Sequence, residues 1–185
     1  MQEMTPKRRY NEIIELLQSG SESEAEQLCR QAVDDNGDVN FIALLGTILA
    51  RRDDLETAES HLRRAVQIAP AYPKANEELG SVLLNRGKPE EAIPFLRKAT
   101  ELTPSSAECF FKLSGALKLA GDNDGASAAF AKSQRLSPSK AKLEEASRLF
   151  AAKKFREAEK LAQELILENP RDVNAALLLS KIAMD

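Results

Sequence analysis

The sequence is poor in the residues from which catalytic and metal sites are usually built. It contains one histidine, two cysteines and no tryptophan. His61 lies in the middle of a predicted helix, and the sequence suggests no nucleophile or carboxylate that would converge on it. Cys29 and Cys109 each fall in an apolar helical pattern, so we expect buried free thiols rather than a disulfide or a metal pair. No catalytic residue, metal ligand or cofactor is predicted.

Other absences each exclude a class of protein. The sequence has no glycine loop that could cradle a phosphate, and no apolar run approaches the length of a membrane span. Residues 1–14 carry a basic patch without an apolar core after it, so they do not form a secretory signal. The net charge of −3 disfavours nucleic-acid binding, which requires an excess of Lys and Arg. We therefore expect a cytoplasmic protein with no nucleic-acid or membrane partner.

What the sequence does contain is a repeat of 34 residues. Three sets of positions keep this step: Gly46, Gly80 and Ser114; Ala58, Ala92 and Ala126; and Pro70, Pro104 and Pro138. Four residues after each alanine comes a large apolar residue, namely Leu62, Leu96 or Phe130. The chain is therefore predicted to contain three copies of one structural unit in succession.

One copy, residues 73–106, is predicted to form two short amphipathic helices joined by a tight turn. Gly87 can take the left-handed conformation that ends the first helix, and Pro104 cannot continue the second. The small residues Gly80 and Ala92 allow the two helix backbones to approach closely. A hairpin of this size cannot bury its own apolar face and needs copies of itself on either side.

A 34-residue period with Leu-Gly early, Ala-x3-Phe or Leu in the middle and a closing proline resembles the tetratricopeptide repeat. The resemblance is strong over residues 39–140, although Ile42, Asn76 and Phe110 stand where this family usually has tryptophan. It implies an all-α fold, a right-handed solenoid of antiparallel helix pairs. It also implies a concave groove, lined by the first helix of each repeat, that holds a peptide or a partner helix.

We expect a single array over residues 6–185. Its predicted parts are a divergent first repeat (6–35), three clear repeats (39–72, 73–106 and 107–140), an irregular repeat (140–170) and a lone C-terminal helix (172–185). The step from Ala126 to Ala158 is two residues short of the period, so the irregular repeat should be rotated relative to its neighbours.

Residues one turn apart on the inner face of the first helices should point into the groove together. The repeats that are in phase place nine residues there: Asn40, Ala43, Thr47, Lys74, Glu77, Ser81, Glu108, Phe111 and Gly115. The shifted repeat would add Glu144 and Arg148. Phe111 beside Gly115 would form an exposed apolar spot, and exposed aromatic residues are favoured at interfaces. The alternative is that these are surface positions without a ligand.

The resemblance implies a protein–protein interaction scaffold with no catalysis of its own. Some members of the family hold the carboxylate of chaperone tails with Lys, Asn and Arg, but here Ala43, Thr47, Glu78 and the pair Glu108 and Lys112 occupy those positions. We therefore expect a polar partner segment rather than a chaperone tail. Two alternatives stay open. The chain could be the docking region of a larger enzyme, such as a transferase that carries these repeats, or a self-assembling structural module.

The C-terminal helix, which starts near Asp172, is apolar around most of its circumference. Leu178 and Ile182 can pack back onto the preceding repeat. We expect that Leu177, Leu179 and Met184 cannot all be covered in that way. Two explanations follow: the chain is a fragment of a longer protein with a further C-terminal domain, or two copies form a homodimer through this helix. Of these two we favour the fragment.

Overall fold

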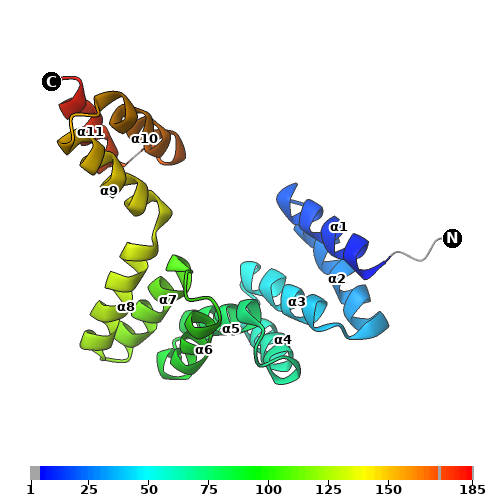
Figure 1. Cartoon of the computed structure of the whole chain (residues 1–185). Coiled ribbons are helices and arrows are strands. Elements are labelled where there is room, and N and C mark those ends of the chain that lie inside the picture. Colours follow the sequence, from blue (N-terminus) through cyan, green and yellow to red (C-terminus); the bar gives the residue numbers. More distant parts are fainter. Residues whose placement is uncertain (1–4, 171, 185) are drawn as a thin grey trace. The chain divides into compact units, whose positions relative to one another are not determined.

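The computed structural model describes residues 5–170 and 172–184, and all the regular structure in these ranges is helical. The helices are α1 (Pro6–Gln18), α2 (Glu22–Asn36), α3 (Val39–Arg51), α4 (Leu55–Ile68), α5 (Pro73–Asn85), α6 (Pro89–Leu102), α7 (Ala107–Leu119), α8 (Asn123–Leu136), α9 (Pro138–Ala151), α10 (Phe155–Glu168) and α11 (Val173–Ile182). Short turns join consecutive helices, and pairs such as α3 with α4 and α5 with α6 pack against each other (Figure 1). The predicted fold class, all-α with antiparallel helix pairs, is confirmed.

The chain divides into two compact units, Met1–Ala129 and Phe130–Asp185, and the boundary falls inside α8. Each unit has its own group of buried residues. The predicted single array over residues 6–185 stays a prediction, as do the limits of its repeats.

The helix ends are set by polar caps and by glycine. The side chain of Asp54 accepts a hydrogen bond from the backbone N–H of Thr57 at 3.3 Å, and that of Asp122 accepts one from Gly125 at 2.8 Å. Gly87, just after α5, has a φ of 70°, which is the left-handed conformation expected from the sequence. These caps explain why the helices begin and end where the sequence pattern predicts.

Two glycines allow the helices of a pair to approach closely. A Cβ atom added to Gly46 would lie 2.6 Å from Cγ of Leu62, and one added to Gly80 would lie 2.4 Å from Cγ of Leu96. Both leucines are completely buried. The contact between α3 and α4 and that between α5 and α6 are therefore built on the absence of a side chain, as the repeat pattern predicts.

The third copy of the sequence pattern differs. Ser114 takes the place of the glycine, and its hydroxyl donates a hydrogen bond to the carbonyl oxygen of Phe111 at 2.8 Å. Phe130 is 45% exposed, whereas Leu62 and Leu96 have no exposed surface. Phe130 belongs to the second unit and both leucines to the first. Leu62, Leu96 and Phe130 occupy equivalent positions in the sequence, but only the two leucines are fully buried.

A buried glutamate ties each of two second helices to the turn that follows the next first helix. In α2, Glu26 pairs with Arg30 at 2.7 Å and with Arg52. In α4, Glu59 pairs with Arg63 at 2.8 Å, with Lys88 at 3.2 Å and with Arg86. Only 5% of Glu26 and 7% of Glu59 is exposed, so each carboxylate needs these cationic partners to offset its desolvation.

The core of the second unit is formed by α9, α10 and α11. Ala146, Ala162 and Leu178 are buried there, and Phe150 and Ile182 pack around them. The prediction that Leu178 and Ile182 pack back onto the preceding helices is confirmed. Across residues 5–170 and 172–184, every helix is too short or too polar to cross a bilayer.

Both cysteines are buried free thiols, as predicted. The thiol of Cys29 donates a hydrogen bond to the carbonyl oxygen of Phe41 at 3.3 Å, and burial raises its pKa to about 12. This thiol therefore stays protonated near neutral pH, which makes it a core residue rather than a nucleophile.

Candidate protein-interaction surface

Three first helices of the first unit, α3, α5 and α7, contact one another in sequence along the chain. Figure 1 labels these three helices and colours them from cyan (α3) to green (α7). Most of the residues predicted to line a groove lie on these three helices. We call the surface that they form the first-helix face.

A lattice of ion pairs links α5 to α7 on this face. Lys74 pairs with Glu78 at 2.7 Å and lies 3.6 Å from Glu77. Lys112 pairs with Glu108 at 2.8 Å and also with Glu77, which places Glu77 between the two lysines. Lys74, Glu77 and Glu108 are predicted groove residues. The structure brings them together, and it adds Lys112 as the cation that joins the two helices.

The ion pairs hold Lys74, Lys112 and Glu108 in their charged forms. Burial would lower the pKa of Lys112, but hydrogen bonds to Glu108 and Glu77 outweigh it, so this pKa is raised. Burial and the hydrogen bond to Glu78 oppose each other in the same way at Lys74, and its pKa is also raised. The hydrogen bond from Lys112 is the main cause that lowers the pKa of Glu108. Lys74, Lys112 and Glu108 are therefore charged at neutral pH.

An exposed apolar strip runs along α7 next to this lattice. Phe111 is 58% exposed and Leu119 is 68% exposed. Gly115 lies midway between them in the sequence, and an added Cβ there would have no atom within 4 Å. Residues spaced four apart lie on one side of a helix. Two large apolar side chains thus flank an open space above Gly115, and we call this arrangement the α7 notch.

The sequence reasoning found Phe111 and Gly115 but missed Leu119. The signal was available, because Leu119 continues the same spacing of four residues.

Other predicted groove residues on α3 and α5 are less accessible. Asn40 is exposed, but Ala43 is buried, and Thr47 and Ser81 are half-buried. The Thr47 hydroxyl donates to the carbonyl oxygen of Ala43 at 3.1 Å, and the Ser81 hydroxyl donates to that of Glu77 at 3.0 Å. Both hydroxyl protons are therefore used within their own helices. A partner could contact these hydroxyls only as acceptors.

Glu144 and Arg148, the two candidates from the shifted repeat, lie on α9 in the second unit. Both are exposed, and Arg148 lies 3.4 Å from the carboxylate of Glu145. Their membership of a common groove with the first-helix face stays a prediction.

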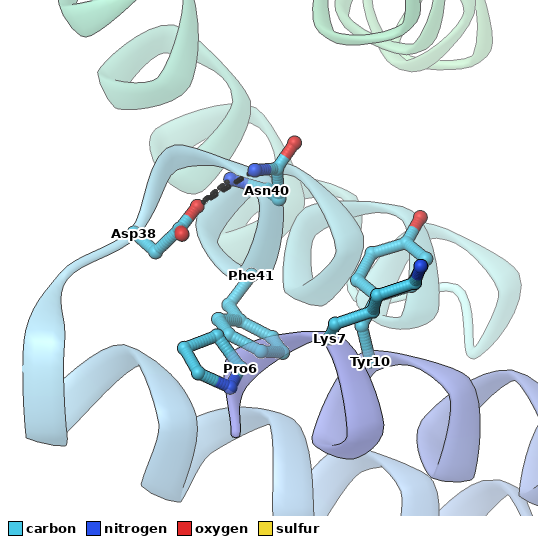
Figure 2. Close-up of a pocket in the computed structure, with 6 residues that line it drawn as sticks. All are labelled: Pro6, Lys7, Tyr10, Asp38, Asn40 and Phe41. Carbon is cyan, nitrogen blue, oxygen red and sulfur yellow. Dashed lines mark hydrogen bonds between the residues drawn. The ribbon is translucent and has the colours of Figure 1, made fainter.

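A pocket of about 310 Å³ lies between the start of α1 and the start of α3 (Figure 2). Its lining residues are Pro6, Lys7, Tyr10, Asp38, Asn40 and Phe41. The rings of Tyr10 and Phe41 have their centroids 6.1 Å apart. Both the backbone N–H and the side-chain amide of Asn40 donate to Asp38, at 2.8 and 2.9 Å. The pocket therefore has an apolar floor and a polar rim, which suits a side chain with an apolar body and a polar end.

Among the described residues, the charged groups that act most on His61 are Arg64, Arg30 and Asp54. His61 is half-buried, and burial followed by the positive charges of Arg64 and Arg30 lowers its pKa below the ordinary value of 6.5. The imidazole is therefore neutral at pH 7. Within the described residues, no three His, Cys, Asp or Glu side chains come close enough together to hold a metal ion.

We expect His61→Ala to leave the helical circular-dichroism signal unchanged and to shift the free energy of unfolding by less than about 1 kcal/mol, because the side chain is only half-buried. Peptide binding should also be unchanged. Loss of a tightly bound metal, measured by elemental analysis of the parent and the variant, would contradict this view of His61.

The helix pairs recur at a fixed period in the sequence. In the pairs α3–α4 and α5–α6, a glycine stands where the two helices touch. These features define an α-helical repeat protein. The tetratricopeptide repeat family profile matches residues 43–107, 77–141 and 143–185. These segments span well over half of the sequence, and the chain belongs to the tetratricopeptide repeat (TPR) family. Proteins of this class are generally non-catalytic and bind other proteins on the extended surfaces that their stacked repeats create.

The fold is similar to that of solved TPR structures. A thermophilic TPR protein of Thermus thermophilus is 16% identical with a TM-score of 0.66, and the alignment covers 98% of this chain and 100% of that one. MamA, from residue 41 to its end, of Desulfovibrio magneticus is 19% identical with a TM-score of 0.66, over 98% and 96% of the two chains. At these identities the likeness concerns the fold alone. A comparison with curated protein sequences finds no significant match.

Proposed function

We propose that the first-helix face binds an extended segment of a partner protein, which inserts one large apolar side chain into the α7 notch. The observation that carries this proposal is the exposure of Phe111 and Leu119 on either side of open space at Gly115. An apolar side chain seated there would contact both residues. The chain would act as a binding scaffold, with no catalysis of its own.

The energy of such a contact is sufficient to anchor a short segment. Full burial of one large apolar side chain stabilises by about 1.5–3 kcal/mol. An aromatic anchor gains further from an edge-to-face contact with a ring such as Phe111. A residue at position 115 larger than glycine would fill the space, so the notch depends on Gly115.

The remainder of the segment should be polar and of mixed charge. The lattice beside the notch contains two lysines and three carboxylates that are already paired, so it offers neither sign of charge a strong advantage. An ammonium group has three N–H donors. Lys112 directs two of them to Glu77 and Glu108, which leaves one for a carbonyl or hydroxyl oxygen of the partner.

We expect Phe111→Ala to weaken peptide binding by about tenfold or more, because an exposed aromatic anchor is lost. The free energy of unfolding should change by less than about 1 kcal/mol, since the ring is more than half exposed. Peptides would be selected from a displayed random library on the whole chain, and the enriched pool then titrated against the parent and the variant. Its members should share one large apolar residue among polar ones.

Leu167→Ala is the matched control for this experiment. Leu167 is 83% exposed and lies on α10 in the second unit, whereas the first-helix face belongs to the first unit. Its truncation should leave binding unchanged. Equal binding of the pool by the parent and Phe111→Ala would refute the proposed anchor, and so would an equal loss in both variants.

A further inference from the structure

The pocket between α1 and α3 takes no part in the proposed function, and its rim carries groups of both charges. In Figure 2, Asp38 lies on one side of the opening and Lys7 on the other. Both helices begin at the pocket, so the positive ends of their dipoles lie there as well. A cation would be repelled by Lys7 and by these helix ends, and an anion would be repelled by Asp38. The rim therefore favours a neutral occupant.

The floor of the pocket is aromatic. The rings of Tyr10 and Phe41 have their centroids 6.1 Å apart, and their planes are tilted by 51°. Phe41 is 1% exposed, so the core fixes its position, whereas Tyr10 is only half-buried. A third ring can join such a pair through an edge-to-face contact. The floor therefore favours an aromatic occupant.

Asp38 supplies a hydrogen-bond acceptor in a fixed place. As the cap of α3, its Oδ1 accepts hydrogen bonds from the backbone N–H and the side-chain amide of Asn40, at 2.8 and 2.9 Å. A carboxylate has about four lone-pair sites, so these two bonds do not saturate it. Hydrogen bonds to a carboxylate are also stronger than those to a neutral oxygen. An occupant with both an aromatic ring and an O–H donor would match the floor and the rim together.

Tyr72, which precedes α5, shows how a phenol behaves near Asp38. Burial, followed by the nearby side chains of Tyr10 and Asp38, raises the pKa of Tyr72 above its ordinary value of 10.0. Its phenol therefore keeps its proton near neutral pH. A second phenol in the pocket would meet the same negative charge, so it would also stay neutral and remain a hydrogen-bond donor.

We propose that this pocket binds a tyrosine side chain of a partner protein, with its ring against Tyr10 and Phe41 and its hydroxyl donating to Asp38. A phenylalanine would lack the donor, and a lysine or an arginine would meet the positive charges of the rim. The exposed side chain of Lys7 can lie over the outer face of the bound ring, where the π electrons attract its ammonium.

The pocket lies in the same row of positions as the α7 notch. Tyr10, Ala43, Glu77 and Phe111 follow one another at steps of 33, 34 and 34 residues, on α1, α3, α5 and α7. Packed helices lie about 8–10 Å apart, and an extended chain advances about 3.3 Å per residue. A segment that fills both places would therefore carry its tyrosine about seven to nine residues from its apolar anchor. This spacing rests on the proposed function, whereas the pocket does not.

Two small probes that differ by one hydroxyl group test the pocket. N-acetyltyrosinamide and N-acetylphenylalaninamide would each be titrated into the ¹⁵N-labelled whole chain and followed by NMR. The tyrosine probe should shift the backbone and side-chain amide signals of Asn40 with a Kd on the order of 10 mM. The phenylalanine probe should bind about threefold more weakly or worse, because it lacks the donor. Hydrophobic contact alone would give the opposite order, since phenylalanine is the more apolar probe.

The same titration contains an internal control. Residues 172–174 repeat the sequence of residues 38–40, and Asp172 accepts a hydrogen bond from the N–H of Asn174 at 3.0 Å. Asn174 lies on α11, so it is no part of the pocket. Its signals should stay in place. Equal shifts at Asn40 and Asn174, or no saturable shift at Asn40, would overturn the proposal.

Asp38→Asn then tests how the hydroxyl is recognised. Asparagine also caps helices, so α3 should keep its start while the rim loses its charge. The preference for the tyrosine probe should fall to near equality. Asp172→Asn makes the same change at the repeated cap and should keep the preference. A preference that survives in a folded Asp38→Asn variant would overturn the proposal. If the pocket binds the probe but peptides selected on the chain carry no tyrosine at the stated spacing, the pocket stands and its link to the α7 notch is wrong.

Discussion

Replacement of Gly80 by leucine should lower the free energy of unfolding by about 1–3 kcal/mol or more, through overpacking. Even a single methyl carbon at this position would lie 2.4 Å from Cγ of Leu96. Leu96 is completely buried, so it has no free space into which to move. The helices α5 and α6 would have to separate. Urea denaturation followed by circular dichroism would measure the effect as a shift of the midpoint.

Gly115→Ala is the matched control, because Gly115 is also a helical glycine but has open space around its Cβ position. Alanine is favoured over glycine in a helix, so this change should stabilise the chain by about 0.5–1 kcal/mol. Gly80→Ala and Gly115→Ala should therefore shift the midpoint in opposite directions. If both variants became more stable, the close approach of α5 and α6 at Gly80 would be wrong.

Glu59→Gln should destabilise the chain by about 1–2 kcal/mol at pH 7, since hydrogen bonds to charged groups are among the strongest in proteins. The side chain of Glu59 is 9% exposed and pairs with Arg63, Arg86 and Lys88. The amide keeps the shape of the carboxylate but removes its charge. The three partners are partly exposed and can turn toward water, which keeps the loss moderate.

The pH dependence of this effect has a defined sign. Burial would raise the pKa of Glu59, but the hydrogen bonds from Arg63, Lys88 and Arg86 outweigh it and lower the pKa from 4.5. The stabilisation is therefore fully present above pH 4.5 and is lost as the pH falls through the lower value of the folded state. The difference between the parent and Glu59→Gln should shrink on acidification. If the difference in free energy of unfolding between the parent and Glu59→Gln stayed constant from pH 7 down to acid pH, the ionised carboxylate of Glu59 would not be the source of that stability.

The fold could be predicted from the sequence because its main contacts recur at a fixed step. Gly46 and Gly80 identify the positions where helices touch, and Leu62 and Leu96 identify what they touch. The pattern fails at Phe130, which keeps its place in the sequence but not its burial. A repeat pattern records which residues are equivalent in the chain. Their burial depends on neighbours that need not be equivalent.

The candidate site was less predictable, because its properties arise between helices. Phe111 and Gly115 could be placed from the spacing within α7 alone. The joining of Glu77 to Lys112 depends on the packing of α5 against α7, and a sequence offers many such pairs of opposite charge. Ala43 is buried for the same reason, since the neighbouring helices determine how much of α3 remains accessible. Neither the ion pair between Glu77 and Lys112 nor the burial of Ala43 can be found by inspecting one helix at a time.

The tie between a buried glutamate and the turn of the next hairpin has a consequence for how such a chain can evolve. The two ends of this tie, Glu26 with Arg52 and Glu59 with Arg86, lie 26 and 27 residues apart, which is less than one repeat. A gene duplication or deletion of residues 39–72 therefore leaves every surviving glutamate of these two ties with an arginine at the proper distance. An insertion of a few residues between them would not. This stretch can be gained or lost whole in a single genetic event, while shorter length changes are confined to places outside these spans.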